Sequence, residues 1–227
     1  MSQHAIITGA AGGLGTAVTK AFIDHSYQVT ALTDPRDPDQ IKQLQALGEL
    51  NAEPLNVLDE QEVKTFAAQY NTPLDALVLL VGGFGMGNIT NTTPADVEKM
   101  VQLNFISAYR MVHHFWESLT RAEAGKVVLI GAKPALDPAA GHGLMAYSLS
   151  KGMIFHLAEL LNESGKETNT QAVVVAPSII DTPANREAMP EANFDDWVKP
   201  KAIGQIILEA CRDTALRHQV YRAYANS

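Results

Sequence analysis

Three short apolar runs in this chain show no alternation of apolar and polar residues. They read ALVLLV at 76–81, KVVLIG at 126–131 and AVVVAP at 172–177. A strand with one face in water alternates, whereas a strand of a parallel sheet has helices on both faces and is apolar throughout. The runs therefore predict a parallel sheet enclosed between two layers of helices.

Amphipathic segments separate the apolar runs along the whole chain. Strands are expected at His4–Thr8, Gln28–Leu32, Glu53–Asn56, Ala76–Val81, Lys126–Ile130, Gln171–Ala176 and Gln219–Tyr224, and helices at Leu14–His25, Pro38–Leu47, Glu60–Tyr70, Pro94–Thr120, Tyr147–Ser164 and Lys201–Arg212. Such alternation is typical of a doubly wound α/β fold. Because no linker interrupts the 227 residues, we expect one domain with a seven-stranded, mostly parallel sheet flanked by helices on both faces.

The stretch Asp181–Pro200 departs from this rhythm. It is rich in proline, asparagine and acidic residues, and it lies between the sixth expected strand and the last helix. Long connections inside a compact domain are usually functional. We expect a flap over a substrate, with Met189 and Trp197 as candidate lining residues and ordinary packing as the alternative for both. His142, in the loop before Tyr147, is a further candidate for the edge of the substrate site.

Charge and composition remove several classes of partner. The net charge of -8 argues against nucleic acid and against an acidic membrane surface. The apolar runs are far shorter than the roughly 18–20 residues that span a bilayer. Cys211 is the single cysteine, so neither an intrachain disulfide nor a multi-cysteine zinc site is expected, and its apolar surroundings predict core packing. No metal is expected, and the simplest setting is a reducing, cytoplasmic one.

A glycine-rich turn follows the first expected strand directly. The segment TGAAGGLGTA, residues 8–17, contains Thr8, Gly9, Gly13, Leu14 and Gly15. The first N–H groups of a helix have no intrahelical partner, so glycines before a helix let an anion approach them. In a Rossmann-like fold this turn binds the pyrophosphate of a dinucleotide. The spacing differs from the common G-x-G-x-x-G, and a tight turn without a ligand is the alternative.

Two further features fall at the same edge of the expected sheet. Asp34 ends the second strand, where an acid can accept both ribose hydroxyls of NAD, whereas Arg36 would suit the 2′-phosphate of NADP. NADH is therefore expected, with NADPH left open. A turn-forming aspartate before Pro35 is a compatible alternative. Gly82 and Gly83 follow the fourth strand and are expected to lie along the cofactor.

Tyr147 and Lys151 are four residues apart in a helical pattern. Residues at this spacing share one face of a helix. A nearby ammonium group favours phenolate, so we expect the pKa of Tyr147 to lie below its usual value of about 10 and the phenol to give up a proton near neutral pH. The position of the pair, after the fifth strand and downstream of a nucleotide turn, favours catalysis over a chance pairing on a surface.

Taken together, these motifs resemble those of the short-chain dehydrogenase/reductase family over essentially the whole chain. The resemblance is carried by TGAAGGLG, by LNFISAY with Asn104, by YSLSK with Tyr147 and Lys151, and by APSIIDTP with Pro177 and Thr182. It implies hydride transfer between NAD(P)H and a carbonyl-like centre of a small molecule, in a homodimer or homotetramer. Asn104, Tyr147 and Lys151 would be the catalytic residues.

The resemblance also implies roles for residues around the cofactor. Lys151 would bond the nicotinamide ribose, and Asn104 would hold a water next to Lys151. The backbone near Ile180 and the hydroxyl of Thr182 would hold the carboxamide. Asn56 and Val57 match the adenine-binding Asp-Val pair of the family, with asparagine in place of aspartate.

One departure from the family pattern concerns the substrate. Gly131 and Ala132 stand where the family has a substrate-orienting serine. The segments GAKPALDPAAGHGLMAYSLSKG and DTPANREAMPEANFDDW resemble those of the dihydropteridine reductases within this family, which also lack that serine. This resemblance implies reduction of a quinonoid dihydropterin. A carbonyl or alcohol reductase and a non-catalytic dinucleotide sensor are the alternatives.

Overall fold

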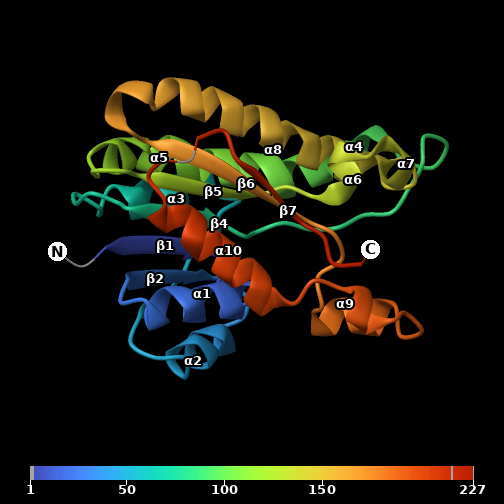
Figure 1. Ribbon diagram of the computed structural model, residues 1–227, viewed down its shortest axis with the longest axis horizontal. Helices are drawn as coiled ribbons and strands as arrows, with labels where there is room; N and C mark the ends of the chain where they lie inside the picture. Colours follow the sequence, from blue (N-terminus) through green and yellow to red (C-terminus); the bar gives the residue numbers. More distant parts are fainter. Residues whose placement is uncertain (1–2, 216, 227) are drawn as a thin grey trace.

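Seven strands form one sheet at the centre of the molecule (Figure 1). The computed structural model describes residues 3–215 and 217–226. The strands are β1 (His4–Thr8), β2 (Gln28–Thr33), β3 (Asn51–Pro54), β4 (Ala76–Leu79), β5 (Lys126–Ile130), β6 (Gln171–Pro177) and β7 (Val220–Ala223). Their order is β3-β2-β1-β4-β5-β6-β7, and every pairing between them is parallel. The expected "mostly parallel" sheet is thus parallel throughout these strands.

Helices cover both faces of the sheet, as the unalternating strands predict. The principal helices are α1 (Gly15–Asp24), α2 (Asp39–Gln45), α3 (Glu60–Ala67), α4 (Pro94–Val101), α5 (Ser107–Thr120), α8 (Met145–Ser164) and α10 (Pro200–Arg212). In Figure 1, α1, α2 and α10 lie on one side of the sheet, and α4, α5 and α8 lie on the other. No helix among the described residues is long and apolar enough to cross a membrane.

Successive strand residues point into two separate cores. Ile7, Val78 and Val128 pack with α1 and α10, whereas their neighbours in the chain pack with α3, α5 and α8. A strand alternates the direction of its side chains, so burial on both sides requires an apolar residue at every position. Cys211 lies in the first core, as expected, and burial raises the pKa of its thiol to about 12.

The expected helix at Pro94–Thr120 is continuous but not uniform. A π-helical turn, η1 (Gln102–Ile106), separates α4 from α5, and it contains the buried Asn104. A π turn inserts one extra residue into the helix and changes the direction of the side chains around it, and such turns are frequent at functional sites. Hydrophobic periodicity predicts the helix but does not reveal one inserted residue.

Short helices occupy two segments that the sequence pattern left as loops. These are α6 (Lys133–Leu136) and α7 (Pro138–Gly141) before α8, and α9 (Pro183–Ala188) inside the flap. Each begins with a proline in its first turn, which suits the helix start because the proline nitrogen has no N–H to leave unpaired. In Figure 1, α9 projects away from both helical layers at one end of the sheet.

Candidate active site and dinucleotide cleft

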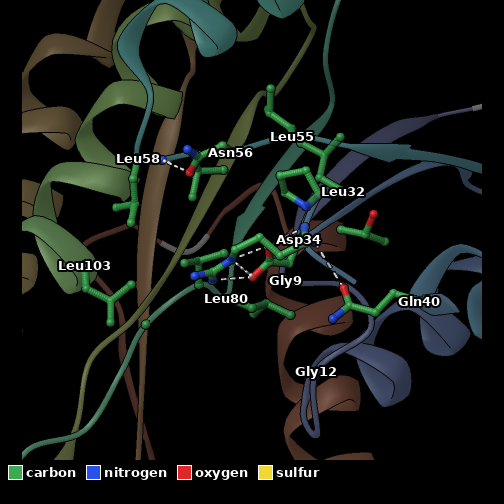
Figure 2. Close-up of a pocket in the computed structure, with 16 residues that line it drawn as sticks. Gly9, Gly12, Leu32, Asp34, Gln40, Leu55, Asn56, Leu58, Leu80 and Leu103 are labelled. Atoms are coloured by element: carbon green, nitrogen blue, oxygen red, sulfur yellow. Dashed lines mark hydrogen bonds and ion pairs between the residues drawn. The ribbon is translucent and has the colours of Figure 1, made fainter. Parts of the chain in front are cut away.

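A cavity of about 260 Å³ opens at the carboxyl edge of the sheet. It is lined by the turn after β1, the end of β2, the segment after β3, the end of β4 and η1; the residues are Gly9, Gly12, Leu32, Thr33, Asp34, Pro35, Arg36, Gln40, Leu55, Asn56, Val57, Leu58, Leu80, Val81, Gly82 and Leu103. Figure 2 shows Leu103 on the side opposite Gln40, with Asp34 between them. Ligands of open α/β sheets bind at this edge, where the strand order reverses between β1 and β4.

The glycine-rich turn leaves the start of α1 open to an anion. No side chain of the described residues caps α1, and its first turn holds no acidic residue. Gly9 has a φ of 64°, and a Cβ there would lie 3.3 Å from Val81 Cγ2. A Cβ at Gly15 would collide with the Gly9 carbonyl oxygen. These close backbone contacts explain the glycines and leave helix N–H groups free to meet a phosphate.

Asp34 lies in this cavity and is paired with Arg36. The Arg36 Nε lies 2.9 Å from Asp34 Oδ1, and its Nη2 lies 2.5 Å from Oδ2. The Arg36 hydrogen bonds lower the pKa of Asp34 to about 2, so the carboxylate is ionised at neutral pH. The two groups that sequence analysis weighed against each other for NAD and NADP therefore bind each other at the same cavity wall (Figure 2).

Asn56 and Val57, in the segment after β3, also line the cavity. The Asn56 Oδ1 accepts a hydrogen bond from the Leu58 backbone N–H at 3.1 Å, drawn as a dashed line in Figure 2. This local turn fixes the segment after β3 and leaves the amide nitrogen of the side chain as a donor. The structure thus brings Gly9, Asp34, Asn56 and Val57 to one cavity.

Tyr147 and Lys151 lie on α8, and Lys151 reaches the end of β5. The Lys151 side chain is 5% exposed, and its Nζ donates a hydrogen bond to the Ile130 carbonyl oxygen at 2.8 Å. A Cβ at Gly82 would lie 3.3 Å from this Nζ and 2.7 Å from Asn104 Oδ1. Gly82, Asn104 and Lys151 therefore lie close together, and Gly82 lines the cavity.

The expected direction of the Tyr147 pKa is wrong for this structure. Burial raises the pKa of Tyr147 to about 12, and burial lowers the pKa of Lys151 to about 8. Helical spacing predicts that the two residues share a face, but it carries no information on how much water either group loses. Desolvation disfavours both the phenolate and the ammonium, and burial is the cause of both shifts.

Asn104 is held by two neighbouring parts of the chain at once. Its Oδ1 accepts from the Gly83 N–H at 2.7 Å, and its Nδ2 donates to Ser150 Oγ at 2.9 Å. Ser150 Oγ in turn donates to the Tyr147 carbonyl oxygen at 2.8 Å. The chain of bonds joins the loop after β4 to the first turns of α8. The sequence motifs point to Asn104 and Gly83 but not to Ser150. The only feature of the sequence that could have indicated Ser150 is its position beside Lys151.

Phe84 is a second residue that sequence analysis missed. It lies in the glycine cluster after β4, and its ring meets the Tyr147 ring edge to face, with centroids 5.1 Å apart. The loop is tied to the start of α8, because Gly87 N–H donates to Gly143 O at 2.9 Å and Met145 N–H donates to Gly87 O at 2.7 Å. Phe84 remains 62% exposed, so an apolar surface lies open beside Tyr147.

The remaining candidate residues are distributed around the same edge. Thr8 Oγ1 accepts from the Leu80 N–H at 3.1 Å and so ties β1 to β4. Pro177 ends β6, and Thr182 is so close to the glycine turn that a Cβ at Gly13 would lie 2.8 Å from Thr182 Cγ2. The side chain of Leu14, at the start of α1, packs against the core.

The three candidate substrate residues stay predictions, and the structure places them as follows. His142 is exposed and donates through Nδ1 to the Ala139 carbonyl oxygen at 2.8 Å. Met189 is exposed at the end of α9. Trp197 is 4% exposed and packs against Phe194, with ring centroids 4.8 Å apart.

A dinucleotide fits the groups that line this edge. The cavity joins the glycine turn that leads into the uncapped α1, an ionised carboxylate after β2 and an asparagine amide after β3. These groups match a phosphate, a ribose and a base respectively, and the glycines remove the side chains that would block the backbone. The buried Lys151 lies beside Gly82, which lines the same cavity.

Comparison with known proteins agrees with this geometry. The family model described as short chain dehydrogenase matches residues 3–193. The dihydropteridine reductase of Dictyostelium discoideum is 26% identical over 215 residues, which cover 92% of this chain and 87% of that protein. The acetoacetyl-CoA reductase of an Acinetobacter species is 26% identical over 187 residues, or 79% and 75% of the two chains.

Solved structures share the fold. An NADPH-bound short-chain oxidoreductase from Pseudomonas aeruginosa PAO1, described as having an atypical catalytic centre, superposes with a TM-score of 0.88 at 18% identity, covering 97% of this chain and 95% of that chain. An oxidoreductase from Burkholderia thailandensis gives 0.86 at 23% identity, covering 98% and 91%. The family model matches most of the chain, and the cleft and the tyrosine–lysine pair agree with it. This chain therefore belongs to the short-chain dehydrogenase/reductase family of oxidoreductases.

Proposed function

We propose that this protein uses NADH to reduce a small, conjugated imine or carbonyl compound, with a quinonoid dihydropterin as the first candidate. The observation that carries the proposal is the position of Tyr147, which has Lys151 one helical turn away and the exposed Phe84 ring against its own. A proton donor and a flat apolar surface are thus side by side near the dinucleotide cleft. The likeness to a dihydropteridine reductase supports the choice of substrate.

The chain's own groups would bind the cofactor and supply a proton. The nicotinamide, when bound, supplies the hydride. The start of α1 would bind the pyrophosphate, Asp34 the adenosine ribose, Asn56 and Val57 the adenine, and Ile180 and Thr182 the carboxamide. Tyr147, with a pKa of about 12, holds its proton at neutral pH and would give it to the substrate heteroatom. Lys151 would bond the other ribose and stabilise the phenolate that remains.

NADH is the preferred cofactor in this proposal because Asp34 is ionised. A carboxylate accepts ribose hydroxyls and repels a 2′-phosphate. Arg36 already bonds this carboxylate, so a 2′-phosphate would have to break that pair before it could use the guanidinium. The carboxylate should therefore dominate the choice between the two cofactors.

The absence of a hydroxyl at Gly131 and Ala132 supports a reactive, flat substrate. Ala132 is buried, and a Cβ at Gly131 would lie 2.6 Å from Phe155 Cζ. A conjugated imine accepts hydride without a hydrogen bond from a serine at this place, and the Phe84 ring offers a surface for stacking. We also propose a homodimer or homotetramer that uses the exposed apolar residues of α5 and α8.

The experiment is a kinetic and binding comparison of the wild type with Tyr147→Phe. NADH oxidation is followed with quinonoid dihydropterin and with a panel of small aldehydes and ketones, and NADH and NADPH binding are measured by fluorescence titration. We expect turnover with the dihydropterin, tighter binding of NADH than of NADPH, and a loss of about 10²–10⁴-fold in kcat for Tyr147→Phe with NADH binding retained.

The other outcomes separate the alternatives. Turnover with only the aldehydes or ketones would replace the pterin assignment by a carbonyl reductase. Tight NADH binding without turnover of any compound would favour a dinucleotide sensor. Full activity of Tyr147→Phe would show that Tyr147 is not the proton donor.

A further inference from the structure

Asp181 stands at the root of the flap and has no role in the proposal above. Its side chain is 9% exposed and accepts hydrogen bonds from two cations. Arg186 Nε and Nη2 lie 2.5 and 2.9 Å from the two carboxylate oxygens, and Lys199 Nζ lies 2.8 Å from Oδ2. Arg186 belongs to α9 on the outgoing limb of the flap, and Lys199 ends the returning limb just before α10.

The backbone closes the neck of the flap at the same point. The Asp181 N–H donates to Val198 O at 2.9 Å, and the Val198 N–H donates to Ile179 O at 2.9 Å. Residues 182–197 therefore form a closed loop whose two ends are hydrogen-bonded to each other. The carboxylate adds a third link between the limbs, and it is an ionic one.

Both cations are also fixed from inside the flap. The Arg186 guanidinium lies over the Phe194 ring at 4.5 Å, and Lys199 Nζ also donates to the Phe194 carbonyl oxygen at 3.0 Å. Phe194 packs against the buried Trp197. Charge-assisted hydrogen bonds are the stronger ones in proteins, and two fixed donors set a single position for the carboxylate between them.

The residue after Asp181 contacts the glycine turn. A Cβ at Gly13 would lie 2.8 Å from Thr182 Cγ2. Thr182 Oγ1 accepts from the Asn185 N–H at 3.3 Å, and Asn185 Nδ2 donates to the Ile180 carbonyl oxygen at 2.8 Å. A shift of the Asp181 backbone would thus move Thr182 relative to the turn that begins α1.

We infer that Asp181 is a positioning residue. It acts on the bound dinucleotide through its neighbours Ile180 and Thr182. This inference rests on the proposed function. By tying Arg186 and Lys199 together, the carboxylate holds the flap root against the glycine turn, so the groups that would face the nicotinamide are in place before the cofactor arrives. Loss of the charge would leave two cations facing each other across the neck and favour an open flap.

The test compares Asp181→Asn with the wild type. If the fraction of molecules with a closed flap falls to about a tenth of its wild-type value, the Kd for NADH rises about tenfold. The kcat at saturating NADH should fall less than about threefold. Chymotrypsin cleavage of the flap, which contains Phe194 and Trp197, measured without NADH, should be at least about fivefold faster because the loop opens more often. Asp181→Glu should restore part of the affinity.

Asp24→Asn is the matched control, since Asp24 also pairs with a lysine, Lys20, but lies at the far end of α1. It should leave NADH binding and flap cleavage unchanged. If Asp181→Asn does not fold, Arg186→Gln and Lys199→Gln each remove one of the two links and should each raise the Kd. Wild-type affinity and cleavage rates in the Asp181 or both cation variants would overturn the inference. Failure of the wild type to bind NADH would instead overturn the proposed function, and the cleavage rates would still report on the flap.

Discussion

The side chains around the end of β5 leave little room for any residue larger than glycine at position 131. A Cβ at this residue would lie 2.6 Å from Phe155 Cζ and 2.9 Å from Val174 Cγ1; Val174 is buried in the core, and the half-buried Phe155 packs against it. A serine here would collide with both side chains unless they moved. Packing around Gly131 therefore leaves no room for a hydroxyl, which agrees with a substrate that needs none.

We expect Gly131→Ser to lower the free energy of unfolding by about 1–3 kcal/mol through overpacking. Gly152→Ala is the control, because nothing lies within 4 Å of a Cβ there and the residue is inside α8. That change should raise stability by about 0.5–1 kcal/mol, since glycine is costly in a helix. Urea denaturation measures both, and equal effects of the two substitutions would contradict the packing argument.

The buried Lys151 should make stability depend on pH. Its pKa is about 8 in the folded protein, against 10.5 for the ordinary side chain. Between these values the unfolded chain binds a proton that the folded chain does not, so stability rises with pH. From pH 8 to pH 10 the gain is about 2 kcal/mol, at 1.36 kcal/mol per pH unit for a full proton.

Lys151→Met removes this contribution. The difference in unfolding free energy between the wild type and this variant should shift in favour of the wild type by about 2 kcal/mol from pH 8 to pH 10. Urea denaturation of both proteins at the two pH values gives this difference. Other titrating groups are common to both proteins and cancel. A difference that does not change with pH would show that Lys151 is not held in a dehydrated environment.

Among the elements, η1 and α8 depend on each other through Ser150. The buried hydroxyl accepts from Asn104 Nδ2 in η1 and donates to the Tyr147 carbonyl oxygen in α8. The only other acceptor near Asn104 Nδ2 in the described part of the chain is Met100 Sδ at 3.9 Å. The π turn thus brings an amide to the helix that carries the proposed catalytic pair, and Ser150 fixes their relative position.

Ser150→Ala should destabilise the protein by about 1–3 kcal/mol, because it leaves a buried donor without a strong acceptor. Ser148→Ala is the nearest control, since Ser148 Oγ makes a longer, half-buried bond to Gly141 O at 3.3 Å. Its loss should cost less than about 1 kcal/mol. The denaturant midpoints of the two variants measure these losses of stability. A larger loss for Ser148→Ala than for Ser150→Ala would contradict the assignment.

At the scale of the whole molecule, apolar side chains are exposed on the outer faces of α5 and α8. Leu149, Met153 and Leu160 on α8 and Tyr109 on α5 are exposed apolar side chains, and Leu149 is 53% exposed. Leu149 and Met153 are one helical turn apart and share a face. Members of this family are typically oligomeric, and we propose this surface as the contact between copies.

Leu149→Glu should convert an oligomer into a monomer, because it places a charge at the centre of an apolar contact. Val220→Glu is the control, since Val220 is also an exposed apolar residue but belongs to the edge strand β7 and not to α5 or α8. Light scattering with size-exclusion chromatography measures the mass of each variant. An unchanged mass for Leu149→Glu would place the interface elsewhere.

The sequence by itself determined the layered fold and most members of the candidate site. Unbroken apolar runs require burial on both faces, and parallel strands bring their carboxyl ends to one edge. Gly9, Asp34, Asn56 and Gly82 therefore converge whatever the details of packing. The i, i+4 spacing likewise places Tyr147 and Lys151 on one face of a helix.

Only the tertiary structure decided the electrostatics and the positions of the flap residues. Desolvation depends on every group packed around Tyr147 and Lys151, so the pKa of the phenol lies above its usual value where the local pair predicts the opposite. The π turn at Asn104, the Phe84 ring on Tyr147 and the Asp181 ion pairs join residues that are far apart in the chain or in an unexpected helical register. Such contacts follow from three-dimensional packing, and no local pattern encodes them.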